Sequence, residues 1–338
     1  MSRGVGMSKS VADVEKKIPV DNHGSGGFLF PLTLVRKFIR LIHFNVYSLS
    51  ADKDAIYITS DEPDPGFIEY FYPGTTITPV KSIFAWSLGR YARNYSTAII
   101  DMHPFLARFF SGGVFTVRWI RQEISLDTPF EELFTDRERK REQKKAVAFH
   151  YEISKDPADL QVFYDTMYLP FLRTRHQHPT ILEFDYLLNN YLKKNGELLF
   201  IKKDGRVIAG GLCNLVGETY HLGTLGLKDE SYINEGAIAA LYYYGIRLAY
   251  ERGAKFVDLG LSRPFLSDGV VIYKRKWGGS IRRDDKNNHV LYLKNLTKNG
   301  LIVLEQDKLR AVVTGDEVFF SRTYPDEGIE RSENSSGI

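Results

Sequence analysis

The chain has few of the features that would place a protein in a simple class. It contains a single cysteine, Cys213, which excludes an internal disulfide bond and is typical of a reducing compartment. Cys213 lies in the apolar run VIAGGLCNLV, so we expect a core thiol rather than a nucleophile. The net charge is only +3 over 338 residues. This balance argues against nucleic-acid binding over the whole surface and limits such contacts to local basic segments.

A long apolar run is also missing. The segment 28–44 comes nearest to one, but Pro31, Arg36, Lys37 and Arg40 interrupt it and no small-residue cleavage site follows. We therefore predict neither a signal peptide nor a membrane span, and a cytoplasmic location. Two interpretations of the segment remain open. It is either a basic amphipathic helix on the inner face of an anionic membrane, or a helix packed on the first domain with its basic face in water.

The chain does have the length and the aromatic content for two domains, with 20 Tyr and 22 Phe for cores and grooves. In the first half, 55–59 (AIYIT), 97–102 (TAIIDM) and 114–124 (VFTVRWIRQEI) each predict one strand. The predicted divisions are a disordered N-terminus over 1–27, a reduced α/β part over 28–127, a basic helical linker over 128–146, a larger α/β domain over 147–325 and a disordered tail over 326–338.

The linker carries the strongest local charge. Segment 137–145 (RERKREQKK) has six basic and two acidic side chains, a local net charge of +4. Such a run on a helix is typical of a solvated face. The alternative is an arm that follows the phosphates of a tRNA or of an anionic lipid surface, with binding that weakens as salt rises.

Three strands are predicted in the middle of the second half. Segments 197–203 and 206–216 flank Asp204-Gly205, which is a strong signal for a two-residue hairpin turn. Segment 218–228 follows directly. Together the three predict an antiparallel meander.

After the meander the pattern becomes helix, strand and helix. Asn234 is predicted to cap a long helix that ends at Gly253, and 255–261 (KFVDLGL) predicts a short buried strand. Pro264 then breaks the chain, and 268–277 (DGVVIYKRKW) predicts a final helix. In such an alternation, functional residues are expected at the carboxyl ends of the strands.

Three features of this region resemble a known superfamily. Gly236-Ala237 opens the long helix, ERGAKFVDLGLS follows at 251–262, and YKRKWG at 273–278 has the pattern aromatic-Lys-x-x-aromatic-Gly. They resemble the acyl-CoA N-acyltransferase (GNAT) superfamily. More narrowly, they resemble its Fem-type aminoacyltransferases and the related GNAT-like proteins of cell-envelope and polysaccharide synthesis. The resemblance extends from about Val147 onward.

The resemblance implies an α/β fold with a mixed, mainly antiparallel central sheet flanked by helices. Fem-type enzymes combine two GNAT-like domains, so 28–127 is interpreted as a reduced first half and 147–325 as a complete second one. The resemblance also implies an acyl-CoA or an aminoacyl-tRNA as co-substrate, and no metal.

The donor site is implied to lie at the start of the long helix. In CoA-dependent members, backbone N–H groups of this turn receive the pyrophosphate. The donor-binding candidates that match are Gly226, Lys228, Asn234, Gly236 and Ala237. The turn here has one glycine and three acids, which would repel a pyrophosphate. An aminoacyl-tRNA needs less of this turn, because only its acyl end reaches the chemistry, so the acids favour aminoacyl transfer.

Either donor requires an amine to attack an activated carbonyl through a tetrahedral oxyanion. The resemblance implies Tyr273 as the general acid toward the leaving group, and Lys274 as a cation that stabilises developing charge or holds an acceptor phosphate. Asp258, a polar residue inside a buried strand, is a candidate base, ion-pair partner or structural hydrogen-bond acceptor. The competing interpretations are a core aromatic for Tyr273 and a solvated helix end for Lys274.

The acceptor-binding candidates lie in two segments. They are Tyr168, Arg173, Arg175, Ser262, Arg263 and Ser267. In Fem-like families the helix pair after the first strand lines the acceptor groove, so Arg173 or Arg175 is implied to grip a carboxylate or phosphate; the alternative is a pair of surface charges. His176 and His178 have a spacing that invites a metal, but no cysteine or suitably spaced carboxylate accompanies them, so no metal site is predicted.

The sequence thus predicts transfer of an acyl or aminoacyl group to an amine of a small-molecule or lipid-linked precursor of the cell envelope or of a polysaccharide. A tRNA is a candidate partner, and 28–44 and 137–145 are candidates for peripheral membrane contact. The rival interpretation is a catalytically inactive GNAT-like binding module in an envelope-assembly complex. The acidic donor turn favours that rival, and the clustered Tyr273, Lys274 and Arg263 oppose it. The sequence leaves open the donor, the acceptor and the oligomeric state.

Overall fold

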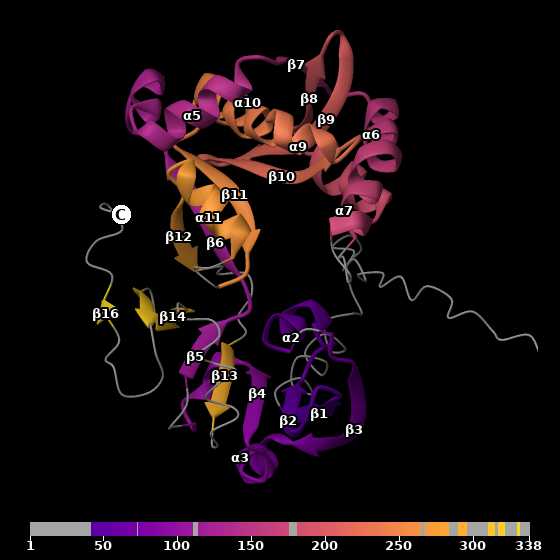
Figure 1. Ribbon diagram of the computed structural model, residues 1–338, viewed down its shortest axis with the longest axis vertical. Helices are drawn as coiled ribbons and strands as arrows, with labels where there is room; N and C mark the ends of the chain where they lie inside the picture. The colour runs from indigo at the N-terminus through magenta and orange to yellow at the C-terminus, as the bar shows by residue number, and fades with distance from the viewer. Residues whose placement is uncertain are drawn as a thin grey trace, which may run out of the picture.

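The computed structural model describes residues 42–72, 74–110, 114–175, 181–264, 268–283, 290–295, 310–314, 317–321 and 330–331. Two parts of the chain lie one above the other in Figure 1, each built on a large β-sheet. Each large sheet has one parallel pair of strands and is otherwise antiparallel, and helices flank both. The predicted α/β class with mainly antiparallel sheets is confirmed.

The first sheet has the strand order β3-β1-β2-β4-β13-β5. Its strands are β1 (His43–Leu49), β2 (Asp52–Thr59), β3 (Ile77–Phe84), β4 (Thr97–Met102), β5 (Val114–Val117) and β13 (Val290–Asn295). The second sheet has the order β12-β6-β11-β10-β9-β8-β7. Its strands are β6 (Ile120–Ser125), β7 (His150–Ser154), β8 (Gly196–Lys203), β9 (Arg206–Val216), β10 (Thr219–Leu227), β11 (Phe256–Ser262) and β12 (Ser280–Arg283). A small third sheet contains β14 (Arg310–Thr314), β15 (Glu317–Ser321) and β16 (Glu330–Arg331).

The helices differ in length and type. The α-helices are α2 (Pro65–Phe71), α3 (Leu88–Ala92), α4 (Pro104–Ala107), α5 (Arg137–Ala146), α6 (Pro157–Phe163), α7 (Leu169–Arg175), α8 (Phe184–Leu187), α9 (Ser231–Glu235), α10 (Ala237–Glu251) and α11 (Gly269–Lys276). Short 3-10 turns are η1 (Ala85–Ser87) and η2 (Phe130–Phe134), and π-helical turns are η3 (Tyr164–Tyr168) and η4 (Leu188–Leu192).

Helices cover both faces of the second sheet. Leu199 and Ile201 of β8 face one core with α5 and α10, whereas Leu198 and Phe200 face another with α6, η3 and η4. Successive side chains of a strand point to opposite faces, so a strand covered on both sides is apolar throughout. The predicted hairpin turn is confirmed, with Asp204 and Gly205 both at positive φ between β8 and β9.

The two large sheets exchange strands. β5 lies in the first sheet, and the chain then crosses into β6 of the second sheet. In the opposite direction, β12 lies in the second sheet and β13 inserts between β4 and β5 of the first. The boundary between the sheets therefore does not coincide with the predicted boundaries at 127 and 147.

The prediction of a single strand over 114–124 was wrong. The buried positions change phase between Val117 and Ile120, and the segment forms β5 and β6 in different sheets. Arg118, between the two strands, forms an ion pair with Asp101 of the first sheet. The next residue, Trp119, lies 3.8 Å from the guanidinium of Arg263, measured to the ring centroid. These contacts hold the crossover at the junction of the two parts.

The predicted cap of the long helix was also wrong. Asn234 lies inside the short helix α9, where Asp229 accepts hydrogen bonds from the backbone N–H and hydroxyl of Ser231. Gly236, at φ +104°, then separates α9 from α10. A left-handed residue at this position favours glycine and ends one helix before the next begins.

Some of the predicted elements lie wholly or partly outside the residues that the structure describes. The segment 1–27, predicted to be disordered, and most of the helix predicted over 28–44 lie outside the described residues. Within the tail over 326–338, residues 330–331 form β16, paired with β15. No helix among the described residues combines the length and the apolar composition that crossing a bilayer requires.

Candidate active site

The parallel strands β10 and β11 form a fork. They pair at only three positions, ending with His221 opposite Asp258, and then separate. Both strands are irregular at that point. β10 has a register shift relative to β9 between Leu222 and Leu225, and β11 has one relative to β6 between Asp258 and Leu261. Polar side chains thus lie where the sheet opens.

Asp258 is the centre of a charged cluster at the fork. It is 5% exposed, and its carboxylate accepts hydrogen bonds from the Gly260 N–H at 2.9 Å and from Arg121. Nδ1 of His221 lies 2.7 Å from the same carboxylate. Burial raises the pKa of Asp258, but the His221 hydrogen bond and the Arg121 charge outweigh burial and hold this pKa below its usual value. Asp258 is therefore an ionised ion-pair partner at neutral pH.

His221 is the cluster member best placed for chemistry. Its side chain is 26% exposed, and within the described residues its Nε2 has no hydrogen-bond partner. When Nδ1 donates to a carboxylate, the neutral imidazole carries its lone pair on Nε2. The pair can then accept a proton from a bound group at Nε2.

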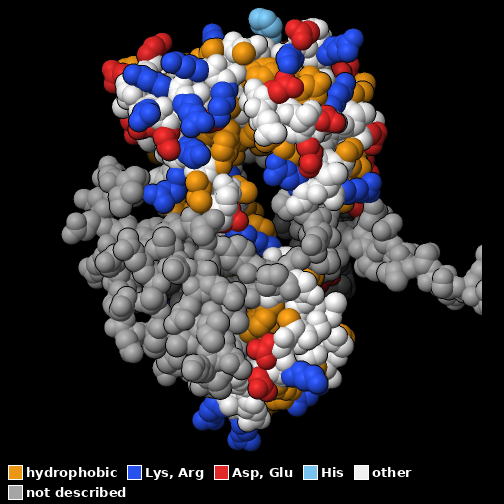
Figure 2. Space-filling view, in the orientation of Figure 1, with side chains coloured by type: hydrophobic (Ala, Val, Ile, Leu, Met, Phe, Trp, Pro, Cys, Tyr) orange, Lys and Arg blue, Asp and Glu red, His pale blue; other side chains and the backbone are white. Residues whose placement is uncertain are grey.

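The cluster lies on the sheet face opposite α10. Tyr220 and Leu222, on either side of His221 in β10, both belong to the core beneath α10, so His221 faces the other way. In Figure 1, β11 and α7 descend from β10 on its two sides, and Figure 2 shows a hollow between these two arms. Arg121 on β6 is 27% exposed beside Asp258.

Lys274 lies behind the fork with its charge enclosed by the protein. Asp268 caps α11 and directs Lys274 toward β11. Its Nζ donates to the carbonyl of Gly260 at 2.9 Å, to the carbonyl of Leu261 at 2.8 Å and to Oγ of Ser262 at 2.9 Å. Burial lowers the pKa of Lys274 to about 7, against the opposing effect of the Asp258 and Asp268 charges. All three hydrogens of the ammonium are used internally.

The network around Lys274 is closed. The hydroxyl of Ser262 donates to Oε1 of the buried Gln122 at 3.1 Å, and Nε2 of Gln122 donates to the Val271 carbonyl at 3.2 Å. Gly260, at φ +78°, turns the backbone of β11 where its carbonyl and that of Leu261 meet Lys274. Lys274 and Ser262 therefore fasten α11 to β11 and β6, and neither faces the hollow with a spare hydrogen.

Tyr273 points to a different partner from that of Lys274. Its ring packs edge-on against Tyr242 of α10, with ring centroids 5.3 Å apart, and burial raises its pKa. The residue belongs to the core between α10 and α11. The structure does not bring Tyr273, Lys274 and Asp258 together as one catalytic group.

Arg263 joins the two halves of the chain. Its guanidinium donates to both oxygens of Asp64, at 2.7 and 3.0 Å, and stacks on Trp119. Asp64 in turn caps α2. A bidentate, stacked arginine of this kind is well suited to hold a domain junction. Ser267, predicted nearby, lies outside the described residues.

The predicted donor residues do not form one site. A Cβ on Gly226 would lie 2.6 Å from backbone atoms of Met167 and Tyr168, so this glycine allows η3 to approach β10. Gly236 and Ala237 are buried, and a Cβ on Gly236 would lie 2.9 Å from Cβ of Lys145 in α5. The start of α10 is thus covered by α5. Lys228 and Asn234 are exposed on the turn that precedes it.

The predicted acceptor residues on η3 and α7 also differ in environment. Tyr168 is 2% exposed, its hydroxyl accepts from the Leu182 N–H at 3.0 Å, and burial raises its pKa to about 12. Arg173 and Arg175 are exposed at the end of α7. His176 and His178 lie outside the described residues, which contain no cluster of metal-binding side chains elsewhere.

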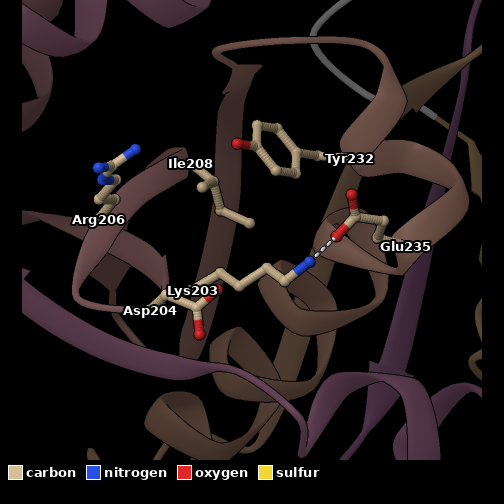
Figure 3. A pocket seen from close by; sticks show the side chains of 6 residues that line it. All are labelled: Lys203, Asp204, Arg206, Ile208, Tyr232 and Glu235. Carbon is tan, nitrogen blue, oxygen red and sulfur yellow. Dashed lines mark hydrogen bonds and ion pairs between the residues drawn. The ribbon is translucent and has the colours of Figure 1, made fainter.

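Two surface pockets lie away from the fork. The first, of about 380 Å³, is lined by Lys203, Asp204, Arg206, Ile208, Tyr232 and Glu235 (Figure 3). The ion pair between Lys203 and Glu235 crosses it. The second, of about 440 Å³, is lined by Phe130, Glu131, Gln143, Tyr243, Arg247, Tyr250 and Glu251.

Sequence reasoning missed His221 and Arg121. His221 is a titratable residue in a mostly apolar strand, and Arg121 is one of several polar residues in β6, so each is a weak signal by itself. They meet Asp258 only through the register of β10, β11 and β6. That register depends on pairings between distant segments, which the local sequence does not encode.

Known proteins resemble this chain in sequence and in structure. Residues 134–275 match the family model of the acetyltransferase (GNAT) domain. The structure of FemX has a TM-score of 0.42 and 15% sequence identity, covering 64% of this chain and 77% of that one. The structure of L-PGS from Bacillus licheniformis has a TM-score of 0.41 and 13% identity, covering 75% and 83%. A putative GNAT-family acetyltransferase from Novosphingobium aromaticivorans has a TM-score of 0.33 and 15% identity, covering 58% and 73%.

No curated protein sequence matches the chain significantly. The structural similarities are weak, so the assignment depends on the family model. That model includes the basic helix α5, the fork and all but the last residue of α11. Residues 134–275 therefore form a GNAT acetyltransferase domain, which is the acyltransferase part of the chain.

Proposed function

We propose that this chain transfers an aminoacyl or acyl group to an amine of a cell-envelope or polysaccharide precursor, at the fork between β10 and β11. The observation that carries the proposal is the His221–Asp258 pair, 2.7 Å apart where the strands separate. Attack by an amine requires a group that removes its proton and a space open to both substrates. We assign the proton-removing group to the fork, and the hollow beside the fork suits the two substrates (Figure 2).

An aminoacyl-tRNA is the donor that the surroundings favour. A CoA pyrophosphate would need open N–H groups at the start of α10, but α5 covers Gly236 there. The exposed turn before it carries Asp229, Glu230 and Glu235 against Lys228, and although Glu235 pairs with Lys203, the turn offers an anion no surplus of positive charge.

The outer face of α5 has the opposite character. Its exposed residues Arg137, Lys140, Arg141 and Lys144 recur at helical spacing, and we call them the basic stripe. Figure 2 shows Lys and Arg side chains gathered over α5. None of the four forms an ion pair among the described residues. Such a stripe suits the phosphates of a nucleic acid.

The acceptor is proposed to be a small-molecule or lipid-linked amine that carries a phosphate or carboxylate. Arg121 lies beside the fork, 27% exposed, and Arg173 and Arg175 are exposed on α7, across the hollow. Guanidinium groups bind carboxylates and phosphates through paired hydrogen bonds. Two separated arginine positions would hold the anionic part of an acceptor while its amine reaches His221.

The test is a transfer assay with the full chain. Donors are a mixture of charged tRNAs or acetyl-CoA, and acceptors are glucosamine, a lysine-containing cell-wall peptide and vesicles containing phosphatidylethanolamine. We expect transfer from charged tRNA, with binding that weakens as salt rises. A Lys140→Glu/Arg141→Glu variant should bind tRNA at least tenfold more weakly. The control, Lys53→Glu/Lys155→Glu, makes the same charge change at exposed lysines elsewhere.

Each outcome of the transfer and binding assays supports or rejects one part of the proposal. Transfer from acetyl-CoA alone would reject the tRNA donor and keep the acyltransferase. An equal loss of tRNA binding in the control variant would reject the basic stripe as the docking surface. Absence of transfer from every donor to every acceptor would reject the proposed reaction in favour of a binding module.

A further inference from the structure

We propose that His221 is the general base of this acyltransferase, and that Asp258 and Arg121 position it. The proposal rests on the function proposed above, because it assigns a role within that reaction. His221 takes the proton of the attacking amine at Nε2. Asp258 and Arg121 touch the imidazole or its carboxylate partner and not the reacting atoms, so they are positioning residues.

The contact with Asp258 fixes the orientation of the His221 imidazole. The Asp258 carboxylate is held by the Gly260 N–H at 2.9 Å and by Arg121, so it presents one oxygen to Nδ1 of His221. This arrangement selects the tautomer with hydrogen on Nδ1 and the lone pair on Nε2. A base that is already in the right tautomer and direction needs no reorganisation when the amine arrives.

A second observation concerns the residue beside His221 on β9. Asn214 pairs with His221 in register, is buried, and its Oδ1 has no hydrogen-bond partner. A buried acceptor without a partner is rare in proteins and needs an explanation. Asn214 and His221 share one face of the sheet, so a donor group of a bound amine would satisfy Oδ1 while Nε2 of His221 takes another hydrogen.

The other titratable groups at the fork are less suited to this role. Glu123 lies opposite Asp258 on β6, but it forms an ion pair with Arg282 of β12. Lys274 has no spare hydrogen and lies behind the strands.

Tyr191 of η4 feels the charges of Arg121 and Asp258, and burial is the main cause that raises its pKa. A phenol with a raised pKa is a poor base at neutral pH. Among the described residues around the fork, His221 alone combines an open nitrogen with a fixed direction.

The reaction balances without an oxidant or a metal. The amine lone pair forms a C–N bond to the acyl carbon, the carbonyl electrons move to oxygen, and the amine proton passes to Nε2. When the tetrahedral intermediate collapses, the carbonyl re-forms and the C–O bond to the tRNA ribose breaks, or the C–S bond in the case of a thioester. The proton on His221 then passes to the leaving group, and the imidazole returns to its neutral form.

The experiment compares His221→Gln with the unaltered chain, using a donor and acceptor pair that the transfer assay identifies. We expect kcat to fall by about 10²–10⁴-fold, the usual range for loss of a general base, with KM changed less than threefold. Asp258→Asn should lower kcat by at least tenfold with KM unchanged. His150→Gln is the matched control, because His150 is exposed on β7 of the same sheet.

A pH profile separates chemistry from structure. We expect the acidic limb of kcat/KM to change in His221→Gln, because that variant has no imidazole to take the proton of the amine. The charged groups that face His221 are Asp258 on β11 and Arg121 and Glu123 on β6, and Tyr191 on η4 is near them. An unchanged acidic limb in an active His221→Gln variant would overturn the proposal.

A chemical test covers the case in which His221→Gln does not fold. Diethyl pyrocarbonate should modify His221 in the unaltered chain and abolish transfer. Hydroxylamine, which reverses the modification, should restore the activity. Mass spectrometry identifies the modified residue. Full transfer with His221 modified would overturn the base assignment. Absence of any transfer by the unaltered chain would overturn the proposed function instead, so the two failures are distinguishable.

Discussion

The two large sheets share an arrangement at their parallel strands but use it differently. In the first sheet β2 and β4 pair at five positions, from Ala55 opposite Thr97 to Thr59 opposite Asp101. In the second, β10 and β11 pair at three and end with His221 opposite Asp258. In each sheet an aspartate occupies the last paired position of the parallel strands. The strand beside that aspartate's strand, β13 in the first sheet and β6 in the second, comes from the other half of the chain.

Each aspartate also binds an arginine from the segment that leads from β5 into β6. Asp101 forms an ion pair with Arg118, and Asp258 forms one with Arg121. Asp101 is 0% exposed, with the Thr59 hydroxyl 3.4 Å away. The second sheet has a histidine in place of this threonine, and there the sheet opens. The same charge pair therefore closes a sheet in the first half and supports an open site in the second.

We expect the largest loss of stability when the buried ion pair between Asp101 and Arg118 is broken. Asp101→Asn would leave the Arg118 guanidinium without its carboxylate in a nearly buried position. Breaking a buried pair from one side typically costs about 3–5 kcal/mol. We expect a loss of that size in the free energy of unfolding, measured by urea denaturation with an unchanged m-value. A loss below about 1 kcal/mol would show that Asp101 does not hold the first sheet.

Removing the link between the halves should have a smaller effect. Arg263→Ala would take away both hydrogen bonds to Asp64 and the stacking on Trp119. The side chains of Arg263 and Asp64 are 16% and 17% exposed, so water compensates in part, and we expect a loss of about 1–3 kcal/mol.

The control for the linking pair is Arg263→Lys, which keeps the charge but loses the paired geometry. It should lie between the unaltered chain and Arg263→Ala. Equal stability of all three proteins in urea denaturation would argue that the two halves are held together by the exchanged strands alone.

Loss of the Asp258 carboxylate at the fork should lower the free energy of unfolding less than the changes above, and the size of this loss should depend on pH. Asp258→Asn removes the partner of Arg121 and His221, but both side chains reach water, so we expect about 1–2 kcal/mol at neutral pH. The folded pKa of Asp258 lies below the usual value of an aspartate. A lowered carboxylate pKa stabilises the fold above the unfolded value, and this contribution is lost as pH falls through the folded value.

The measurement is the difference in unfolding free energy between the unaltered chain and Asp258→Asn from pH 7 to pH 2. We expect a constant difference above about pH 5 that shrinks on further acidification. A difference that grew as the pH fell would contradict an ionised Asp258.

Local sequence predicted much of the second half, because each element there has its own signal. The Asp204-Gly205 turn places β8 against β9, and Asp268 caps α11. The exchange of β6 and β13 had a weaker signal, because the change of phase between Val117 and Ile120 does not say which sheet receives each strand. Strand partners depend on pairing between distant segments, which alternation does not specify.

The candidate site divides in the same way. Asp258 was visible as a polar residue in a buried strand, but its partners are 37 and 137 positions away in the chain. Lys274 of the motif at 273–278 donates to two carbonyls at the end of β11. The direction of Lys274 depends on the positive φ of Gly260, which turns two carbonyls toward it. The sequence thus indicated which residues gather, and only the backbone shows which of them face the hollow.

The smallest effect on stability is expected at Thr59, the counterpart of His221. Thr59→Val keeps the shape of the side chain but removes its hydrogen bond to Asp101 and the one that its hydroxyl accepts from the Asp61 N–H, so we expect a loss of about 1 kcal/mol and no change in transfer. His221→Gln should show the reverse, with little change in stability and a large loss of transfer. Urea denaturation and the transfer assay on both variants provide the comparison. If Thr59→Val impaired transfer as strongly as His221→Gln, the first sheet would share in the chemistry, and the division between a closed and an open aspartate would be wrong.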